Sequence, residues 1–331
     1  MVLKFMNKIA LAIHGGAGTI RKSEMTAESE TEYRRGLENA LEKGWEVLRK
    51  NGTALDAVEA AVVELENFPL FNAGRGAVFN HAGKNELDAA IMDGATGKAG
   101  AVASVSNVVN PIKLARLVME RTEHILLGGD GANEFAREMD IEFAPDDYFY
   151  TAHRHQQFLQ ARETGSVRLD HAEEMKNEKW KMENGEQKRA ADNRKPIGTV
   201  GAAACDSSGN LAAATSTGGM TNKRFGRIGD TPVIGAGTFA DNRTCAVSCT
   251  GHGEFFMRTL AAYDVSARMK YKKSSLEKAA GEVIENLRRI GGEGGLIAVD
   301  ALGNVAMPFN SDGMYRGLMT ADGVMTVEIY R

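Results

Sequence analysis

GTVGAAACDSSGNLAAATSTGG, residues 198–219, is the stretch that decides the fold. Two runs of small and apolar residues flank a polar segment from Asp206 to Asn210. Gly209 followed by Asn210 is typical of the tight connection between two antiparallel strands. The stretch therefore predicts a β-hairpin.

The same design returns near the end of the chain. GGLIAVDALGNVAMPF, residues 294–309, has Asp300 and Asn304 in the places that correspond to the first turn. Between the two hairpins we expect one helix over residues 253–270 and another that Ser274 opens, with an acidic capping partner three residues on. Two hairpins that flank a helical pair indicate sheets packed together with helices outside.

The first half of the chain alternates strand and helix signals. Residues 9–13 predict a strand that runs into a glycine turn, HGGAG, at residues 14–18. Apolar residues follow a 3.6-residue stripe over residues 33–48, and Thr53 begins a second helix. Three further elements are predicted: a strand over 87–94, a strand over 98–105, and a short helix opened by Asn110 and Pro111.

The composition excludes several classes of protein. Forty basic and forty-four acidic residues give a formal charge of −4, which argues against a nucleic-acid or membrane partner held by bulk charge. The longest apolar runs are strand-sized, and Asn7 and Lys8 interrupt the apolar start, so we expect a cytoplasmic protein. The three cysteines, Cys205, Cys245 and Cys249, are too few for a disulfide scaffold. The even spacing of Cys245 and Cys249 favours core positions for these two over a metal site.

The chain changes character at about residues 162–198. This segment is dense in charge and nearly free of β-branched residues, so it buries too little surface to offset its ordering entropy. A flexible linker is the favoured interpretation. A solvated helix around residues 173–181 is the alternative.

Thr199 stands where this linker meets a predicted strand. If the Gly198–Thr199 bond is cut, Thr199 gains a free α-amine whose pKa of about 7.7–8 makes it a usable base. One residue then supplies both a nucleophilic hydroxyl and its activating base. Alone this signal is weak, because a threonine that begins a strand is usually only a β-branched residue in a sheet.

Nearby residues strengthen the chemical interpretation. Glycines at strand ends let backbone N–H groups approach a substrate oxygen. Arg227 and Asp230, in a glycine-flanked loop, are suited to hold a zwitterion through its carboxylate and its ammonium group. The alternative is an exposed surface ion pair between them.

The whole pattern resembles the plant-type asparaginases, or isoaspartyl peptidases, of the N-terminal nucleophile hydrolase superfamily. The motifs that carry the resemblance are AIHGGAG, PLFNAGRGAVF, LDAAIMDG, the residues 198–230 and CTGHGEFFMR. It covers nearly the whole chain. It implies one hydrolase domain over residues 1–331, an αββα sandwich of two stacked, mainly antiparallel sheets between helical layers.

The resemblance also implies roles. The chain would cut itself into residues 1–198 and 199–331, then hydrolyse β-aspartyl dipeptides and L-asparagine through a β-aspartyl ester on Thr199, without a catalytic cofactor. The roles expected are nucleophile for Thr199, its orientation for Thr217, the oxyanion hole for Thr250 and Gly251 with Asn72 nearby, and substrate anchoring for Arg227 and Asp230.

A sodium ion and an oligomer complete what the resemblance implies. The oligomer is a dimer of heterodimers. The sodium ligands would be main-chain carbonyls between the second helix and the FNAG motif: those of Leu65, Glu66, Phe68, Phe71, Ala73 and Arg75. Backbone ligands tolerate side-chain change, so unusual side chains here do not weaken the expectation.

Some residues depart from the family pattern or invite other interpretations. His252 suggests a Ser-His mechanism, but we expect it at a helix N-terminus, which disfavours its charged form. Arg224 and Phe225 stand where relatives often have an apolar residue and proline, near the expected entrance. HGGAG lacks the GK[ST] ending of a phosphate loop. The alternative to an enzyme is a non-catalytic protein that keeps this fold and binds an amino acid with the same glycine loops.

Overall fold

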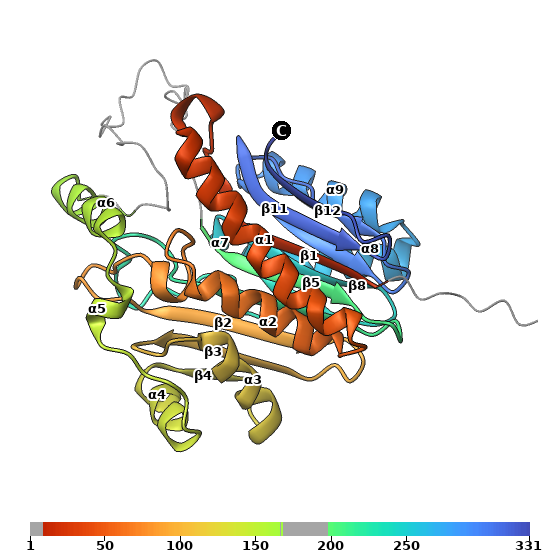
Figure 1. The fold of residues 1–331 in the computed structure, drawn as a ribbon, viewed down its shortest axis with the longest axis horizontal. Coiled ribbons are helices and arrows are strands. Elements are labelled where there is room, and N and C mark those ends of the chain that lie inside the picture. The colour runs from red at the N-terminus through yellow and green to blue at the C-terminus, as the bar shows by residue number, and fades with distance from the viewer. Residues whose placement is uncertain (1–8, 166, 168–197) are drawn as a thin grey trace, which may run out of the picture.

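The structure is a computed structural model that describes residues 9–165, 167 and 198–331. Two β-sheets form its centre and helices flank them (Figure 1). The prediction of a mixed α/β fold with two sheets is confirmed. In the described ranges, no helix is both long and apolar enough to cross a bilayer.

The larger sheet has eight strands in the order β12-β11-β1-β5-β6-β2-β3-β4. Every neighbouring pair is antiparallel except β3 and β4, which are parallel. Its strands are β1 (Ala10–Gly18), β2 (Leu87–Asp93), β3 (Ala99–Val105), β4 (Leu126–Gly128), β5 (Val200–Cys205), β6 (Leu211–Thr217), β11 (Gly313–Thr320) and β12 (Met325–Tyr330). The first predicted hairpin, β5–β6, therefore lies at the centre of this sheet.

The smaller sheet has four antiparallel strands in the order β10-β9-β8-β7. Its strands are β7 (Thr238–Ala240), β8 (Cys245–Gly251), β9 (Gly294–Asp300) and β10 (Val305–Ala306). The second predicted hairpin, β9–β10, therefore belongs to this sheet.

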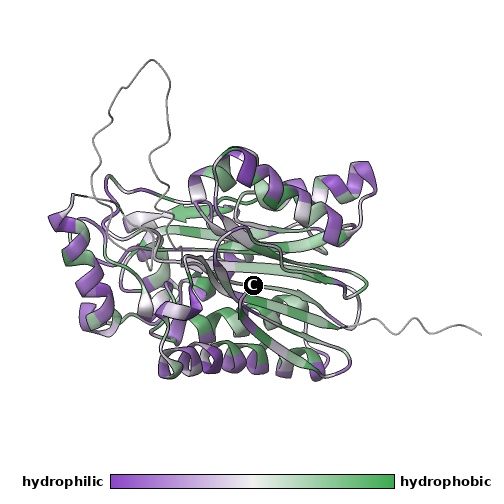
Figure 2. Cartoon of the chain, turned by 90° about the horizontal axis from the view of Figure 1, so that it is seen from above, coloured by the Kyte–Doolittle hydropathy of each residue, from purple (hydrophilic) through white to green (hydrophobic). Residues whose placement is uncertain are grey.

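Helices cover the outer faces of both sheets (Figure 2). The α-helices are α1 (Ala27–Arg49), α2 (Ala54–Asn67), α3 (Pro111–Arg121), α4 (Gly129–Glu138), α5 (Asp146–Phe149), α6 (Ala152–Glu163), α7 (Gly253–Thr259), α8 (Ala261–Lys272) and α9 (Leu276–Arg289). Helices α1, α2 and α3 pack on the larger sheet, and α8 and α9 pack on the smaller one.

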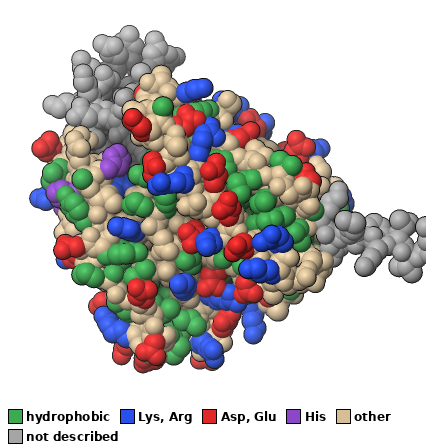
Figure 3. Space-filling model, viewed as in Figure 1, with side chains coloured by type: hydrophobic (Ala, Val, Ile, Leu, Met, Phe, Trp, Pro, Cys, Tyr) green, Lys and Arg blue, Asp and Glu red, His purple; other side chains and the backbone are tan. Residues whose placement is uncertain are grey.

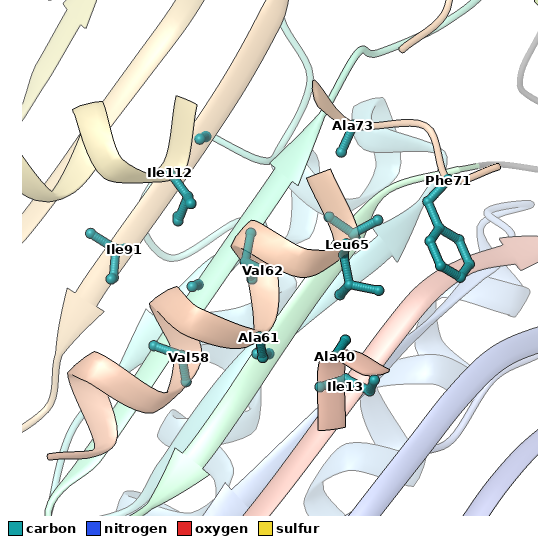
Figure 4. Packing of buried hydrophobic residues seen from close by; sticks show 14 of the residues in the cluster. Ile13, Ala40, Val58, Ala61, Val62, Leu65, Phe71, Ala73, Ile91 and Ile112 are labelled. Atoms are coloured by element: carbon teal, nitrogen blue, oxygen red, sulfur yellow. The ribbon is translucent and has the colours of Figure 1, made fainter. Parts of the chain in front are cut away.

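Strand alternation builds two apolar layers from the same strands. In β1, Leu11 and Ile13 belong to the same apolar cluster as residues of α1 and α2. Figure 4 shows Ile13 in this cluster with Val62 and Leu65 of α2. Ala10 and Ala12 belong to the cluster between the sheets. Small side chains on that inner face let β5 lie against β8, so the two sheets stack closely.

Local capping explains where two of these helices begin. Thr53 accepts a hydrogen bond of 3.0 Å from the backbone N–H of Asp56, so the predicted start of α2 is confirmed. Thr26 does the same for α1 at 3.1 Å. The predicted strands over 87–94 and 98–105 are confirmed as β2 and β3, and Pro111 is the first residue of α3.

Three local predictions were wrong. HGGAG is no turn, because it forms the end of β1 with a bulge between His14 and Gly16. The helix over 253–270 is two helices, since Leu260 adopts a φ of 48° between them. Ser275, not Ser274, caps α9, because its hydroxyl accepts the N–H of the residue three positions on.

Described elements lie at both ends of the charged segment. Helix α6 extends to Glu163, and β5 begins at Val200, one residue after Thr199. The rest of the predicted linker, residues 168–197, lies outside the described residues, as do the alternative helix at 173–181 and residues 1–8.

Acidic and basic side chains are interspersed on the face that Figure 3 shows. This distribution agrees with the near balance of forty basic and forty-four acidic residues. The two cysteines of β8, Cys245 and Cys249, are buried in the core beneath α8 and α9, as predicted.

Candidate active site

The β5–β6 hairpin places Thr199 beside Thr217. Its register pairs Val200 with Ser216, so the next residues outward on the two strands are Thr199 and Thr217. The Thr199 hydroxyl donates to Thr217 Oγ1 at 3.2 Å, and both residues are buried. The predicted proximity of these two threonines is therefore present in the structure.

The carbonyl of Gly198 accepts two hydrogen bonds at this point. Asn72 Nδ2 donates at 2.9 Å and Thr217 Oγ1 at 3.2 Å. The Asn72 amide is oriented by Val78, whose N–H donates to Asn72 Oδ1 at 3.0 Å, and by the carbonyl of Gly219 at 2.8 Å from Nδ2. Two donors on one carbonyl oxygen are suited to stabilise negative charge on it.

Thr250 and Gly251 lie at the end of β8, in the smaller sheet. Thr250 Oγ1 accepts the backbone N–H of Ala17 at 3.3 Å. Among the described residues no hydrogen bond joins Thr250 or Gly251 to Thr199. The connection from β8 to Thr199 runs instead through Ser248 and His14, which bonds the Thr199 carbonyl at 2.9 Å.

Arg227 is held by a partner that the sequence did not suggest. Its Nε and Nη2 each donate to the Glu254 carboxylate at 2.9 Å, in a fork typical of arginine and carboxylate. An exposed ion pair between Arg227 and Asp230 is not what forms, because Asp230 is buried and the ion pair of Arg227 in the described structure is to Glu254. The Nη1 group of Arg227 has no hydrogen-bond partner among the described residues.

Asp230 lies close to this arginine without bonding it. Burial raises the pKa of Asp230 to about 7, and the positive charge of Arg227 opposes the rise. Its Oδ2 has no hydrogen-bond partner within the described residues. A Cβ on Gly253 would fall 2.8 Å from Asp230 Oδ1 and 2.9 Å from Arg227 Nη2, so a glycine there leaves room between the two charged groups.

The loop expected to bind sodium is a series of tight turns. The carbonyls of Leu65, Phe68, Phe71 and Ala73 each accept one backbone N–H, at 3.0–3.4 Å, which leaves each oxygen a second lone pair. A Cβ on Gly74 would lie 2.5 Å from the Glu66 carbonyl oxygen, so that carbonyl faces the inside of the loop. The arrangement fits a cation with backbone ligands.

Arg154 of α6 holds the same loop through hydrogen bonds. Its guanidinium is buried and donates to the carbonyls of Gly76 and Leu70 at 2.9 Å each. These bonds bracket Asn72, which holds the Gly198 carbonyl. The Arg75 side chain instead stacks on Tyr148, 5.4 Å from its ring centre.

The three unusual residues near the entrance have distinct positions. His252 is the N-cap residue of α7, as expected. Phe225 is fully exposed at 101% and adopts a φ of 57°, so it projects from the loop that carries Arg227. Arg224 and Phe225 line a cavity of about 330 Å³ with Lys223.

Sequence reasoning missed His14, Ser248 and Glu254. His14 and Ser248 are 234 residues apart, and no local pattern joins them. For Glu254 a signal existed, since it is the first-turn acid of the helix after Gly251. Pairing it with Arg227 requires the fold.

Comparison with known proteins gives a consistent result. The family model described as asparaginase matches residues 7–329. The isoaspartyl peptidase of Salmonella typhimurium is 51% identical over 327 residues, 98% of this chain and 100% of that protein. The isoaspartyl peptidase of Escherichia coli K12 is 49% identical over 98% of this chain and 97% of its own. A human isoaspartyl peptidase/L-asparaginase is 42% identical over 93% of this chain and 92% of its own. The chain therefore belongs to the asparaginase family.

Proposed function

We propose that this chain is a self-processing threonine hydrolase that acts on β-aspartyl dipeptides and L-asparagine and releases L-aspartate. Its domain would be the αββα sandwich of the N-terminal nucleophile hydrolases, cut into residues 1–198 and 199–331. One observation carries the proposal: the Gly198 carbonyl accepts bonds from Asn72 and Thr217, while the Thr199 hydroxyl lies against Thr217. Relatives named isoaspartyl peptidase support the substrate class.

Self-cleavage begins with attack of Thr199 Oγ on the Gly198 carbonyl carbon. The hydroxyl proton leaves toward Thr217 Oγ1, and negative charge grows on the carbonyl oxygen where Asn72 and Thr217 donate. The C–N bond breaks as Thr217 Oγ1 passes a proton on to the Thr199 nitrogen in place of the one it received, and an ester links Gly198 to Thr199 Oγ. Water then hydrolyses the ester to give the Gly198 carboxylate, the free Thr199 hydroxyl and the free α-amine.

Substrate hydrolysis repeats the same chemistry on another carbonyl. The α-amine of Thr199 takes the proton from its own hydroxyl, which attacks the β-carbonyl of the aspartyl group. Thr250 and Gly251 would stabilise the oxyanion, and the amine leaves with a proton. Water then hydrolyses the β-aspartyl ester. Arg227 would bind the substrate α-carboxylate and Asp230 its α-ammonium, because one is a cation and the other a buried acid with an unused oxygen.

Replacement of Thr199 tests the proposal directly. Thr199→Ala should stay at full length in intact-mass spectrometry, because no hydroxyl remains to attack Gly198. Thr199→Ser is the matched control and should still split into two fragments. If the alanine variant splits before residue 199, the hydroxyl does not cut the chain and the mechanism is wrong.

Sodium and oligomer formation are further parts of the proposal. The carbonyls of Leu65, Glu66, Phe68, Phe71, Ala73 and Arg75 would hold the ion, which would stabilise the turn that carries Asn72 and take no part in bond breaking. Replacing sodium by choline should then lower the melting temperature, whereas EDTA should leave activity unchanged. Light scattering should give the mass of a dimer of heterodimers.

A further inference from the structure

A chain of buried polar side chains runs from Thr199 into the layer between the sheets. The Thr199 carbonyl oxygen lies 2.9 Å from His14 Nδ1, and His14 Nε2 lies 2.8 Å from Ser248 Oγ. Ser248 Oγ is 2.7 Å from Thr215 Oγ1, which is 2.7 Å from Thr238 Oγ1. His14, Ser248, Thr215 and Thr238 are each 0% exposed. We call these four residues the His14 relay.

The protons available on each group fix which residue donates in every hydrogen bond of the relay. A carbonyl oxygen only accepts, so His14 Nδ1 carries the ring proton, and in a neutral ring Nε2 must then accept. Burial lowers the pKa of His14 to about 3, which keeps the ring neutral. Ser248 therefore donates its single proton to His14. It follows that Thr215 donates to Ser248 and that Thr238 donates to Thr215.

Two carbonyl groups compete for these protons and are farther away. Thr215 Oγ1 lies 3.4 Å from the carbonyl of Gly237, and Thr238 Oγ1 lies 3.2 Å from that of Thr231. The Gly237 oxygen already accepts the Cys249 N–H at 2.9 Å. The shorter hydroxyl–hydroxyl contacts of 2.7 Å therefore take the protons.

A glycine on β5 makes room for the relay. Gly201 pairs with His14 on one side and with Thr215 on the other. A Cβ on Gly201 would fall 1.9 Å from Ser248 Oγ and 2.6 Å from His14 Nε2. The contact between His14 and Ser248 thus passes directly over this residue, and any larger residue would displace it.

The relay lies in a layer that is otherwise apolar. Alanine, isoleucine, valine and methionine side chains fill the rest of the space between the sheets. Polar groups there are costly unless every one is paired, and a fully satisfied network fixes a unique arrangement. An arrangement that ends on the backbone of Thr199 fixes the position of that residue.

We propose that the His14 relay is a positioning device that holds Thr199 in its reactive orientation once the chain has been cut. This inference rests on the proposed role of Thr199 as nucleophile. Cleavage releases Thr199 from Gly198, and the β5 ladder begins only at Val200. The bond from His14 to the Thr199 carbonyl then fixes the plane of the Thr199–Val200 peptide. The Cα of Thr199, which carries the amine and the hydroxyl side chain, lies in that plane. A small misplacement of a nucleophile costs much of its rate.

Removing one hydroxyl from the relay tests this inference with little change of shape. Thr215→Val should lower kcat of the mature enzyme on a β-aspartyl dipeptide by about threefold to tenfold, the effect of one hydrogen bond. KM should stay within about twofold, because Arg227 and Asp230 are proposed to hold the substrate. Thr215→Ser restores the hydroxyl and should restore kcat.

Ser266→Ala is the matched control. Ser266 is buried and its hydroxyl lies 2.7 Å from Thr244 Oγ1, outside the relay, so its loss should lower stability without changing kcat. At the other end, His14→Asn keeps a donor near the Nδ1 position, and His14→Leu does not. The asparagine variant should therefore retain more activity than the leucine variant.

Nitrogen NMR of the wild-type protein gives a readout that needs no activity. The His14 ring should carry its proton on Nδ1, the less common tautomer, as the carbonyl contact requires. A proton on Nε2 would overturn the inference, as would an unchanged kcat in Thr215→Val. If the wild type neither splits at Thr199 nor hydrolyses substrate, the proposed function fails instead, and the tautomer still tests the relay.

Discussion

The two hairpins have the same type of turn, but only β5–β6 has its open end in the candidate active site. In β5–β6, Asp206 Oδ1 accepts the backbone N–H groups two and four residues on, at 2.9 and 3.0 Å. In β9–β10, Asp300 Oδ1 does the same at 2.9 and 3.0 Å. Gly209 and Gly303, with φ of 80° and 78°, close the two turns. The local chemistry of the turns is the same.

The difference lies in what surrounds the strands. Strand β6 has seven residues and pairs with both β5 and β2 in the middle of the larger sheet. Strand β10 has two residues at the edge of the smaller sheet. The open end of β5–β6 is thereby surrounded by β1 and by the loop that carries Asn72. Turn chemistry makes a hairpin, and the place of its open end in the sheet decides whether it can form a site.

Breaking the open end of β5–β6 should have the largest effect. Thr217 donates to Gly198 and accepts from Thr199, so Thr217→Val removes both links without changing the shape of the side chain. Loss of one oxyanion donor costs about a hundredfold or more in rate, and self-cleavage should slow by at least that factor. Gel electrophoresis of the precursor over time measures it.

Thr244→Val is the control for Thr217→Val. Thr244 is also buried and bonds another hydroxyl, that of Ser266, yet it lies before β8 and away from Thr199. The Thr244→Val protein should cleave itself at the wild-type rate. Equal rates for Thr217→Val and the wild type would show that the open end of β5–β6 does not drive cleavage.

Arg227, on the loop that follows β6, should have the next largest effect. A guanidinium binds a carboxylate through charge-assisted hydrogen bonds, and the loss of one hydrogen bond to a charged group costs about 1.5–3 kcal/mol. Arg227→Ala should therefore lower kcat/KM for both asparagine and a β-aspartyl dipeptide by about tenfold to a hundredfold. Arg227→Lys should recover part of the loss, because lysine supplies the charge without the fork.

Glu254→Gln separates binding by Arg227 from its positioning. It keeps the arginine and weakens only the fork that holds it, so its effect should be smaller than that of Arg227→Ala. Steady-state kinetics on fully cleaved protein measures all three variants. Wild-type efficiency in Arg227→Ala would mean that this residue does not bind the α-carboxylate.

Asp230 should make substrate binding depend on pH. Its ionised form would bind an ammonium group, and burial raises its pKa to about 7, so each pH unit below 7 should weaken binding by about tenfold. The inhibition constant of L-aspartate measures this without involving the Thr199 base. It should rise as the pH falls from 7 to 5. A constant value over that range would contradict the role.

The same raised pKa affects stability with the opposite sign. The folded protein keeps a proton on Asp230 that the unfolded chain releases near its ordinary value of 3.8. This contribution to stability is present below pH 3.8 and is lost as the pH rises through about 7. Low pH therefore favours the folded state through the proton on Asp230, while it weakens the binding of an ammonium group.

Local patterns predicted the two hairpins and the helices α1, α2, α3 and α9, because their turns and caps use residues close in sequence. The glycines of HGGAG predicted a turn, but pairing with β11 along the segment, and with β5 at His14, keeps it extended and leaves only a bulge. The break at Leu260 has no local signal, since leucine is a good helix former. Of two adjacent serines, only Ser274 has an acidic residue three positions on, so the capping-box pattern favoured it although Ser275 caps α9.

In the candidate site, too, some contacts lie within one hairpin and others depend on the whole fold. The family resemblance implied that Thr217 orients Thr199, and the register of a single hairpin places the two residues side by side. The bond from His14 to Thr199 joins residues 185 apart and depends on the order of strands. The fork from Arg227 to Glu254 depends on where α7 begins. The roles of Thr250 and Gly251 stay predictions.

The smallest effects should come from the two turns themselves. Asp206→Asn and Asp300→Asn each keep an oxygen that can accept the two turn N–H groups. They differ at Oδ2. Asp300 Oδ2 accepts only a side-chain amide, that of Asn304 at 2.8 Å, which can turn over and offer its oxygen instead. Asp206 Oδ2 also accepts the backbone N–H of Ala54, the first residue of α2, at 3.2 Å, and this donor cannot turn over. An amide nitrogen there would face another donor, so Asp206→Asn should lose about 1–2 kcal/mol of stability in urea unfolding and Asp300→Asn less.

Neither turn variant should change the rate of self-cleavage or kcat under conditions where it is folded. The six residues of β5 separate the Asp206 turn from Thr199 by roughly 20 Å, at about 3.3 Å per residue. Over that length the ladder to β1 and β6 holds the strand independently of its turn. If Asp206→Asn slows cleavage while Asp300→Asn does not, and both are fully folded, the turn also adjusts the nucleophile. The division between a common turn and a distinct open end would then be wrong.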